Sequence, residues 1–597
     1  MLCYPPFGGY LIPSREVSMS TMSRYFLLAT IFLLASAKVF ASAPCDIYYR
    51  VTPHYDSTPR RIDVELSFDA EGRHESWLRL ASWAGIKDFG AALVPAPEQP
   101  VGVKLLPGDN INRWKVEHEA KGRVSVSYQL RATLDDPDDG KEQQQEQLYR
   151  TQIGRNWFQF FGYGVLPTVE AWDDTRSGRM CVSLVQPSGE IGPLLGSYMD
   201  GKVQFHANMV LNGPQSQLRH AFYAGGPGWR VTERQLAGGS IVIASRGQQA
   251  LDDTRFADQV AQLLNVQRRF WGDSSSPRQT VVRTPNNSPR NQGGTLVHQA
   301  AVLHVSREFG LKSESFEFLI AHENLHQWFP QRLGGRNMDG PENYWLSEGF
   351  TDYYTHRLLL ASGLWTLDRY AEVLTQTLRG YWRSPARNAT SESIAPRFFS
   401  DRDAGRQMYS RGEILAMGWD RELRMKTPAG LDSVLRNLLL TPEQAAKAEA
   451  PHERVLKALT NSLGNQPREQ IQTHIVQGNS FVMEDGLAGP CFSLGWSDVP
   501  RWILGFDSES FAKRLAIGIV ADGPAYKAGL REGMVLRGWS VYGDDTSKEV
   551  LLQVKTESGN KELRYLPVDG STDRLPTTVV RTGAATDAGC QDWIRRE

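Results

Sequence analysis

The chain has 597 residues, too many for one hydrophobic core, so three or four domains are expected. Its 66 basic and 67 acidic residues give a formal net charge of −1, with neither the basic field of a nucleic-acid-binding protein nor an acidic tail. Composition therefore implies no nucleic-acid partner, and electrostatics does not identify a substrate.

The N-terminal segment has the pattern of an export signal. Arg24 precedes an apolar run that ends at Lys38, and small residues around Ala41 offer a site for signal peptidase. We predict a signal peptide within residues 1–41, with Met22 as its better start and the residues before Met22 as a misassigned extension. Because the run is short, no stable membrane span is expected in the mature chain, which should be periplasmic or secreted.

Residues 44–215 alternate apolar and polar side chains, for example over residues 61–68 and 123–134. Such alternation is typical of antiparallel strands with one buried face. We predict that this part of the chain is an N-terminal β-sandwich domain.

Four cysteines follow the predicted signal, at positions 45, 181, 491 and 590. In an oxidising compartment they allow two disulfides, in any of three pairings. We favour Cys45 with Cys181 and Cys491 with Cys590, because each bond would then close a single predicted domain. Free thiols are the alternative.

Helical patterns dominate the middle of the chain. The stretch 255–272 predicts one helix, and further helical patterns extend from about residue 313 to 480. We therefore assign residues 216–480 to a second, mainly helical domain.

This helical region contains an H-E-x-x-H motif formed by His322, Glu323 and His326. Residues four apart on a helix lie on one face, about 5 to 6 Å from each other, so both histidines can bind one metal ion. Glu348, twenty-two positions after His326, completes a set of two histidines and one carboxylate that is recurrent in catalytic zinc sites. We predict one Zn²⁺ per chain, with Glu323 as the general base.

Asp352 follows Glu348 by four residues on a second helix-like run. A ligating histidine usually donates its other ring N–H to a carboxylate, which fixes the tautomer of the ring. We predict this role for Asp352. The alternative is a pair of surface helices with incidental histidines and acids.

Residues 490–597 combine short strands with a small helix and resemble a PDZ domain. Leu504, Gly505 and Phe506 match the loop that holds a peptide carboxylate in such domains, and residues 523–530 match the short helix that follows. The resemblance implies that the domain binds a peptide C-terminus at a sheet edge. The alternative is that it only caps the catalytic domain.

The chain as a whole resembles the glycyl aminopeptidase family of zinc peptidases, which are gluzincins. The string HENLHQWF followed by WLSEGFTDYY carries most of the resemblance, the segment around Trp83 is similar to a signature of the family's sandwich domain, and the PDZ-like segment completes the order. The resemblance implies a multidomain α+β protein with an N-terminal antiparallel β-sandwich, a thermolysin-like mainly helical zinc-peptidase domain and a C-terminal PDZ-like domain.

The resemblance also implies roles for two further positions. Tyr409 is similar to a tyrosine of a Tyr-x-x-Gly segment that opens a later helix and stabilises the tetrahedral intermediate. The family's glycine-rich strand ends in Glu-His and can bind a substrate's amino terminus, whereas this chain has Val297 before His298. A packing role is the alternative for Tyr409, and an apolar residue at 297 leaves the choice between exopeptidase and endopeptidase open.

The sequence thus predicts a zinc metallopeptidase of aminopeptidase-like type that acts on a peptide or protein substrate. A different class of function is a peptide-binding or chaperone-like envelope protein that uses the PDZ-like domain and has a degenerate metal site. Hydrolysis of a non-peptide bond by the same zinc constellation is a third hypothesis.

Overall fold

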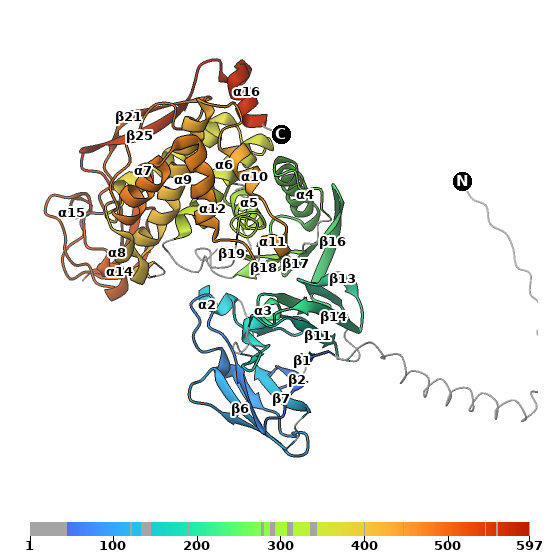
Figure 1. The fold of residues 1–597 in the computed structure, drawn as a ribbon. Coiled ribbons are helices and arrows are strands. Elements are labelled where there is room, and N and C mark those ends of the chain that lie inside the picture. Colours follow the sequence, from blue (N-terminus) through green and yellow to red (C-terminus); the bar gives the residue numbers. More distant parts are fainter. Residues whose placement is uncertain are drawn as a thin grey trace, which may run out of the picture.

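The computed structural model describes residues 45–595 with gaps at residues 56, 120–121, 133–144, 173, 188–190, 276–279, 287–292, 307–313, 335–342, 399, 446, 544 and 557–558. The predicted signal peptide, residues 1–41, lies outside the described residues. In Figure 1 the strands of the N-terminal part lie below a mainly helical body formed by the rest of the chain. The protein is therefore a multidomain α+β molecule with N-terminal β-rich sheets and a helical C-terminal part.

Three sheets form the N-terminal part, with strand orders β14-β11-β1-β2-β7-β4, β10-β3-β6-β5 and β13-β12-β15-β9-β8. Their elements are β1 (Ile47–His54), β2 (Arg61–Asp69), β3 (Glu75–Arg79), η1 (Phe89–Ala92), β4 (Leu93–Pro95), β5 (Val103–Pro107), β6 (Arg113–His118), β7 (Arg123–Arg131), α2 (Gln145–Leu148), β8 (Gln152–Ile153), β9 (Phe158–Phe161), η2 (Gly162–Gly164), β10 (Thr168–Val169), β11 (Gly178–Val185), β12 (Pro193–Gly196), β13 (Met199–Val203), β14 (His206–Gly213), α3 (Ser216–Arg219) and β15 (Phe222–Gly225).

The alternation of apolar and polar residues in the sequence determines which face of each strand is buried. Every second residue of β2, from Ile62 to Phe68, is almost fully buried, and β7 repeats the pattern beside it. The first sheet is mixed rather than wholly antiparallel, because β1 pairs in parallel with β11. This pairing brings the start of β1 beside Cys181, and the predicted disulfide between Cys45 and Cys181 is confirmed.

A fourth sheet, ordered β16-β17-β18-β20-β19, joins the β-rich part to the helices. It contains β16 (Trp229–Leu236), β17 (Gly239–Arg246), β18 (Thr280–Asn286), β19 (Gly293–Val297) and β20 (Ala300–Ser306), with α4 (Asp253–Phe270) between β17 and β18. Strands β17, β18 and β20 are parallel, whereas β19 is antiparallel to β20 and lies at the end of the sheet order. Strand β19 is therefore an edge strand.

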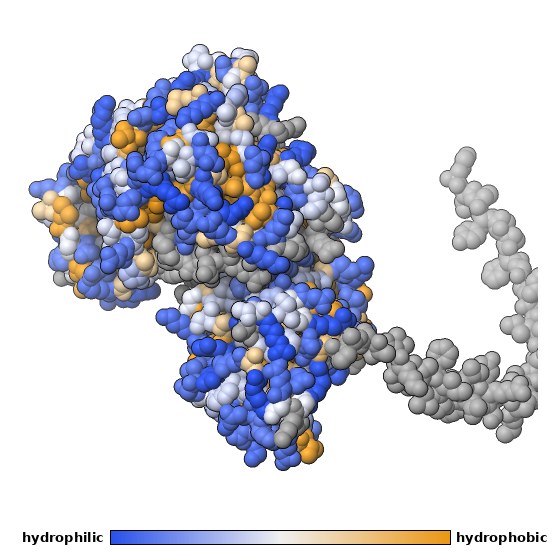
Figure 2. Space-filling model, in the orientation of Figure 1, coloured by the Kyte–Doolittle hydropathy of each residue, from blue (hydrophilic) through white to orange (hydrophobic). Residues whose placement is uncertain are grey.

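The helical body packs around an apolar core rich in aromatic side chains, including Trp328, Tyr354 and Trp419. Its elements are α5 (Glu314–Leu325), η4 (Trp345–Phe350), α6 (Thr351–Ala361), α7 (Leu367–Arg383), α8 (Ser391–Ile394), η5 (Ala395–Arg397), α9 (Arg402–Arg424), α10 (Gly430–Leu438), α11 (Pro442–Ala445), α12 (Pro451–Leu463), α13 (Gln466–Gln470) and η6 (Ile471–Val476). The face shown in Figure 2 is mostly hydrophilic, with hydrophobic residues scattered over this body.

The C-terminal elements divide between the helical body and a smaller unit. They are β21 (Phe492–Pro500), α14 (Glu509–Lys513), α15 (Pro524–Lys527), β22 (Val535–Ser540), β23 (Val550–Thr556), β24 (Gly559–Tyr565), β25 (Thr572–Val580), η7 (Ala584–Thr586) and α16 (Ala588–Arg595).

Strands β21 and β25 pair with each other, and β25 is hydrogen-bonded to α7 through Thr375. The residues between these two strands form the three-stranded sheet β22-β23-β24 and have their own hydrophobic cluster. The predicted disulfide between Cys491 and Cys590 is confirmed, and it ties α16 to the start of β21. Among the described residues, no helix is long and apolar enough to cross a membrane.

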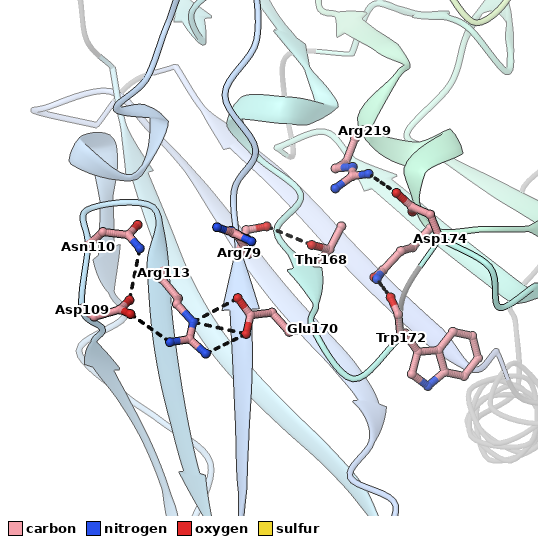
Figure 3. Close-up of a pocket in the computed structure, with 10 residues that line it drawn as sticks. Arg79, Asp109, Asn110, Arg113, Thr168, Glu170, Trp172, Asp174 and Arg219 are labelled. Atoms are coloured by element: carbon pink, nitrogen blue, oxygen red, sulfur yellow. Dashed lines mark hydrogen bonds and ion pairs between the residues drawn. The ribbon is translucent and has the colours of Figure 1, made fainter. Parts of the chain in front are cut away.

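A polar pocket of about 500 Å³ opens in the β-rich part (Figure 3). Its charged side chains are mostly paired with one another: Arg113 contacts Glu170 at 2.9 Å, and Arg219 contacts Asp174 at 2.7 Å. None of the residues that line it is a predicted site residue. The predicted metal ligands lie elsewhere, in the helical body.

Candidate metal centre

The two motif histidines lie at the C-terminal end of α5. His322 is in the last turn of the helix, whereas His326 is the first residue after Leu325, where the helix ends. The chain turns here because the main-chain N–H groups of Trp328 and Phe329 both donate to the carbonyl of Leu325. The two imidazole rings are still only 4.9 Å apart, close to perpendicular, so the sequence spacing places them together as expected.

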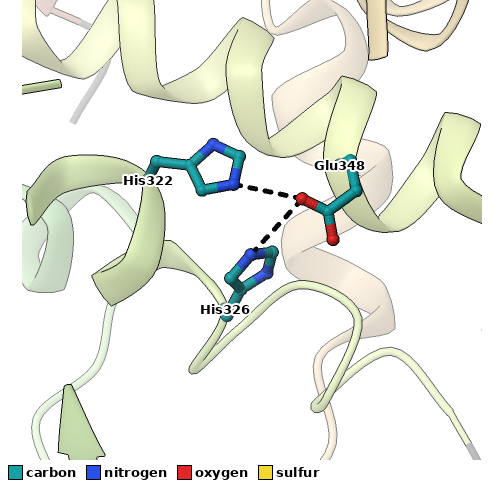
Figure 4. A group of neighbouring side chains, drawn as sticks. All are labelled: His322, His326 and Glu348. Carbon is teal, nitrogen blue, oxygen red and sulfur yellow. Dashed lines mark hydrogen bonds and ion pairs between the residues drawn. The ribbon is translucent and has the colours of Figure 1, made fainter. Parts of the chain in front are cut away.

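Glu348 completes the group from a different element. It lies in the π-helical segment η4, and its Oε2 is 3.1 Å from Nε2 of His322 and 3.7 Å from Nε2 of His326 (Figure 4). One potential ligand atom from each of the three residues falls within 4.8 Å of the others. Two imidazole nitrogens and one carboxylate oxygen, converging from two elements, are a donor set that fits zinc.

Both histidines have a hydrogen-bond partner on the ring nitrogen away from Glu348. Nδ1 of His322 lies 2.8 Å from Oδ1 of Asp352, and Nδ1 of His326 lies 2.9 Å from the carbonyl oxygen of Phe329. A carboxylate and a carbonyl can only accept, so each Nδ1 donates and each Nε2 is left for Glu348 or a metal. Asp352 is therefore placed as predicted, and Phe329 provides the equivalent contact for the second histidine.

The electrostatics of the group favour a charged carboxylate ligand. Burial acts to raise the pKa of Glu348, but the charge of His326 and the hydrogen bond with His322 outweigh it and hold the pKa at about 2. For His322, burial opposes protonation, yet hydrogen bonds with Asp352 and Glu348 raise its pKa well above the usual range. The carboxylates of Asp352 and Glu348 thus favour positive charge beside them, which is what a bound cation would supply.

Glu323 lies beside the histidines and faces the edge strand β19. A Cβ atom on Gly294 would come within 2.8 Å of Cγ of Glu323, so only glycine lets the strand approach this closely. Burial raises the pKa of Glu323, although the charges of His322 and His326 oppose this effect. A carboxylate with a raised pKa is better matched to proton transfer near neutral pH.

Tyr409 lies next to Glu348, but not at the start of a helix. The sequence places it where a helix opens, whereas α9 begins at Arg402, because Asp401 caps the main-chain N–H groups of residues 403 and 404. The tyrosine hydroxyl lies close enough to Glu348 for the carboxylate to act on its pKa. Burial and the nearby negative charge of Glu348 raise its pKa well above 10, which keeps the hydroxyl protonated as a donor.

Close packing of two glycines explains how Tyr409 comes so near the metal group. A Cβ atom on Gly412 would lie 2.0 Å from the carbonyl oxygen of Trp345, and one on Gly349 would lie 2.5 Å from Cα of Gly412. The backbones of η4 and α9 can therefore touch only because both positions are glycine. This contact is the structural reason for the glycine in the Tyr-x-x-Gly segment.

The structure corrects the position given to Val297. Side chains alternate along a strand, so Leu296 shares a face with Gly294, which meets Glu323, whereas Val297 points to the opposite face. Val297 is buried in the core of the β-rich part, and Leu296 packs against a cluster that includes Ile320. The residue on the Glu323 side of β19 is thus Leu296, which is also apolar.

Three groups near the site were not found from the sequence. The hydroxyl of Tyr149, from the β-rich part, donates to the carbonyl of Gly294 over 3.3 Å. Gln267 of α4 donates to the carbonyl of Ala321 over 2.8 Å. His356 and Glu413 form a buried pair. Only this pair had a signal in the sequence, because each member stands four residues after a predicted site residue.

The three residues of the predicted carboxylate loop lie in the small C-terminal unit and do not join the metal group. Leu504 and Phe506 are buried in the cluster of that unit, and Gly505 has a φ of +83°. The carbonyl of Gly505 accepts a hydrogen bond from the main-chain N–H of Val520. Peptide binding at this loop stays a prediction.

Comparisons with known proteins agree with this geometry. Residues 315–411, which span every residue of the metal group, match the profile of the M61 glycyl aminopeptidase family. An aminopeptidase N family protein from Idiomarina loihiensis superposes with a TM-score of 0.66 at 16% identity, over 92% of this chain and 100% of that one. An M1 zinc metallopeptidase from Deinococcus radiodurans gives a TM-score of 0.46 at 14% identity, over 73% and 94% of the two chains. No curated protein matches the sequence.

The ligand group and the family match together define the class of protein, a zinc metallopeptidase. The Idiomarina structure shows that the overall fold is shared with an aminopeptidase N family protein. Within that class, residues 315–411 are similar to the M61 glycyl aminopeptidase family, and this match confirms the resemblance predicted from the sequence.

Proposed function

We propose that the protein hydrolyses peptide bonds with one zinc ion per chain, held by His322, His326 and Glu348. The observation that carries this proposal is the convergence of three ligand atoms within 4.8 Å beside a half-buried glutamate. A degenerate site would be expected to lose at least one ligand or its supporting contact. The contacts of His322 and His326 with Glu348, and of His322 with Asp352, support an intact site.

Zinc bound by these residues would supply a Lewis acid, which polarises the scissile carbonyl and lowers the pKa of water to about 7. Glu323 accepts the proton of the attacking water and returns it to the leaving amine, and burial raises its pKa toward the range that this task needs. Tyr409 donates its hydroxyl hydrogen to the carbonyl oxygen as negative charge develops there. Asp352 keeps the ring of His322 oriented.

We propose an aminopeptidase-like action on peptides, whose dependence on a free amino terminus is the property to measure. A substrate ammonium group needs a carboxylate partner, and the face of β19 that meets Glu323 presents Leu296 instead.

The test compares one peptide series with free and with acetylated amino termini. The zinc-loaded mature protein cleaves the peptides, and the Glu323→Gln variant, which keeps all three ligands, serves as the blank. Cleavage confined to free termini identifies an aminopeptidase, and cleavage of acetylated peptides identifies an endopeptidase. If neither form is cleaved in a Glu323-dependent way, and the purified protein holds no zinc near one equivalent, a peptide-binding protein replaces this proposal.

Other parts of the proposal concern the whole chain. Export to the periplasm or the medium is supported by the signal-like N-terminus and by two disulfides, which form in oxidising compartments. We divide the mature chain into a β-sandwich domain (44–215), a thermolysin-like peptidase domain (216–480) and a PDZ-like domain (490–597). The separate hydrophobic cluster around Leu504 supports a C-terminal unit that could take a peptide C-terminus.

A further inference from the structure

His356 and Glu413 form an ion pair inside the helical body, one helical turn beyond the metal group. Nδ1 of His356 lies 2.7 Å from Oε1 of Glu413, and their side chains are only 6% and 2% exposed. Aromatic rings surround the histidine: Phe318 at 5.2 Å, Trp365 at 5.6 Å and Tyr370 at 6.5 Å between ring centres. Nothing in the proposed reaction uses this pair directly.

The pair repeats the spacing of the catalytic side chains on the same two helices. His356 follows Asp352 by four residues on α6, and Glu413 follows Tyr409 by four residues on α9. Residues four apart share a helix face. Glu348 lies on η4, which runs directly into α6, and its carboxylate is a neighbour of Tyr409 on α9; one turn further along, His356 of α6 pairs with Glu413 of α9. Between these contacts, Gly349 and Gly412 bring the backbones together.

The ring of Phe318 links the pair to the metal group from a third direction. Phe318 on α5 lies 5.7 Å from the ring of His322 and 5.2 Å from that of His356. A shift of His356 would therefore displace side chains on two helices: α5, which carries the first metal ligand, and α9, which carries Tyr409.

Stability alone is a poor reason for a pair at this position. Burying two ionisable groups costs solvation energy, and well-packed apolar residues in their place are often as stable or more so. The pair is also incompletely satisfied, because Oε2 of Glu413 has no hydrogen-bond partner among the described residues. An ion pair is more specific in its geometry than an apolar contact, because it holds two helices in one register and at one distance.

We propose that His356 and Glu413 are positioning residues that set α9 against α6 so that the Tyr409 hydroxyl reaches the developing oxyanion. The inference rests on the proposed peptidase function and deepens it. It predicts that the pair acts through Tyr409, so its loss lowers kcat but leaves KM and zinc content unchanged.

A double-mutant cycle with Tyr409 tests this coupling. Glu413→Gln removes the charge and keeps the shape, and we expect it to lower kcat by roughly tenfold in the wild-type background, within the range of coupling between neighbouring groups. In a Tyr409→Phe background the same change should cost less than about twofold, because the hydroxyl that the pair positions is already gone. A merely structural role would give the same loss in both backgrounds.

Asp432→Asn is the matched control. Asp432 pairs with Arg357 of α6 at 2.6 Å and is as deeply buried as Glu413, but it lies on α10, which carries no predicted site residue. Its loss should lower stability while its effect on kcat combines additively with Tyr409→Phe. This variant separates general loosening of α6 from the specific coupling to α9.

A second measurement does not depend on turnover. Calorimetric binding of a phosphonate peptide, which mimics the tetrahedral intermediate, should weaken by about the same factor in Glu413→Gln as kcat falls, whereas binding of the cleaved peptide products should not change. If Glu413→Gln does not fold, the double variant His356→Gln/Glu413→Gln keeps a neutral hydrogen bond and takes its place. Equal losses in both backgrounds, or unchanged phosphonate affinity, would overturn the inference while leaving the peptidase function standing; absence of Glu323-dependent cleavage in the wild type would overturn both.

Discussion

The polar pocket of the β-rich part and the interior of the helical body both contain ion pairs of similar length, but they differ in their access to water. In the pocket, Arg219 and Asp174 are 2.7 Å apart with side chains 16% and 49% exposed. In the helical body, Arg357 and Asp432 are 2.6 Å apart with side chains 4% and 2% exposed. From the distances alone, the two ion pairs would be expected to be equally strong.

Burial changes what such a pair does. Exposed pairs are screened by water and contribute about 0–1 kcal/mol, whereas removal of one partner of a buried pair leaves an uncompensated charge and costs about 3–5 kcal/mol. The buried pairs of the helical body hold α6, which carries Asp352, against its neighbours. The ion pairs compared in the helical body, which supports the metal group, are therefore buried, whereas those of the polar pocket are in contact with water.

The largest effect on stability is expected at Asp432. This carboxylate accepts two hydrogen bonds from Arg357 and a third from the hydroxyl of Tyr354. Asp432→Asn should lower the free energy of unfolding by about 3–5 kcal/mol, measured by urea denaturation of the purified protein. A loss below about 1 kcal/mol would show that the pair of Arg357 and Asp432 contributes no more to stability than an exposed pair of the pocket.

Tyr409, the uncharged side chain beside the metal group, should affect kcat rather than the free energy of unfolding. Tyr409→Phe removes one donor to the oxyanion and is expected to lower kcat by about 10²–10³-fold, or about 2.7–4 kcal/mol of barrier. Tyr128→Phe is the control from the β-rich part, because its hydroxyl is buried far from the metal group and donates to the carbonyl of Val165 over 2.8 Å. That variant should lose about 1 kcal/mol of stability and no kcat. Similar kcat values for the two variants would contradict the role given to Tyr409.

Asp352 is expected to act through the metal. Asp352→Asn keeps the shape but removes the charge that orients His322, so zinc affinity should fall by about 10–100-fold, measured by competition with a chelator. In the folded Asp432→Asn variant zinc affinity should not change, since that carboxylate contacts no ligand. Equal zinc affinity in Asp352→Asn and the wild type would leave the contact with His322 without a function.

The sequence predicts the histidine pair and the strands for one reason: both depend on local spacing. The four-residue interval between His322 and His326 spans the last turn of α5, and the alternation along β2 lies within one strand. The placement of Tyr409 beside η4 depends instead on the contact between Gly349 and Gly412, sixty-three positions apart. Spacing within one element does not determine a contact between two elements.

The same reasoning applies to the residue on β19 that faces Glu323. The pattern Gly-Gly-Thr-Leu-Val-His can be aligned from either end, and only the contact between Gly294 and Glu323 shows that the face of Gly294 and Leu296, not that of Val297, is turned toward the site. A one-residue shift moves every side chain of a strand to the other face. Function assigned along an edge strand therefore needs the structure, even where the motif is clear.

The smallest effect is expected in the pocket, and it sharpens the comparison most. Asp174→Asn removes the partner of Arg219, whose head group stays partly in contact with water, so the unfolding free energy should fall by no more than about 1 kcal/mol. The loss should shrink further at 1 M salt, where screening reduces the interaction between exposed charges, whereas the loss in Asp432→Asn should persist. Asp174→Asn could instead lower the unfolding free energy as much as Asp432→Asn does, with no dependence on salt. That result would show that the pocket excludes water as well as the helical interior does, and that solvent exposure does not distinguish the two regions.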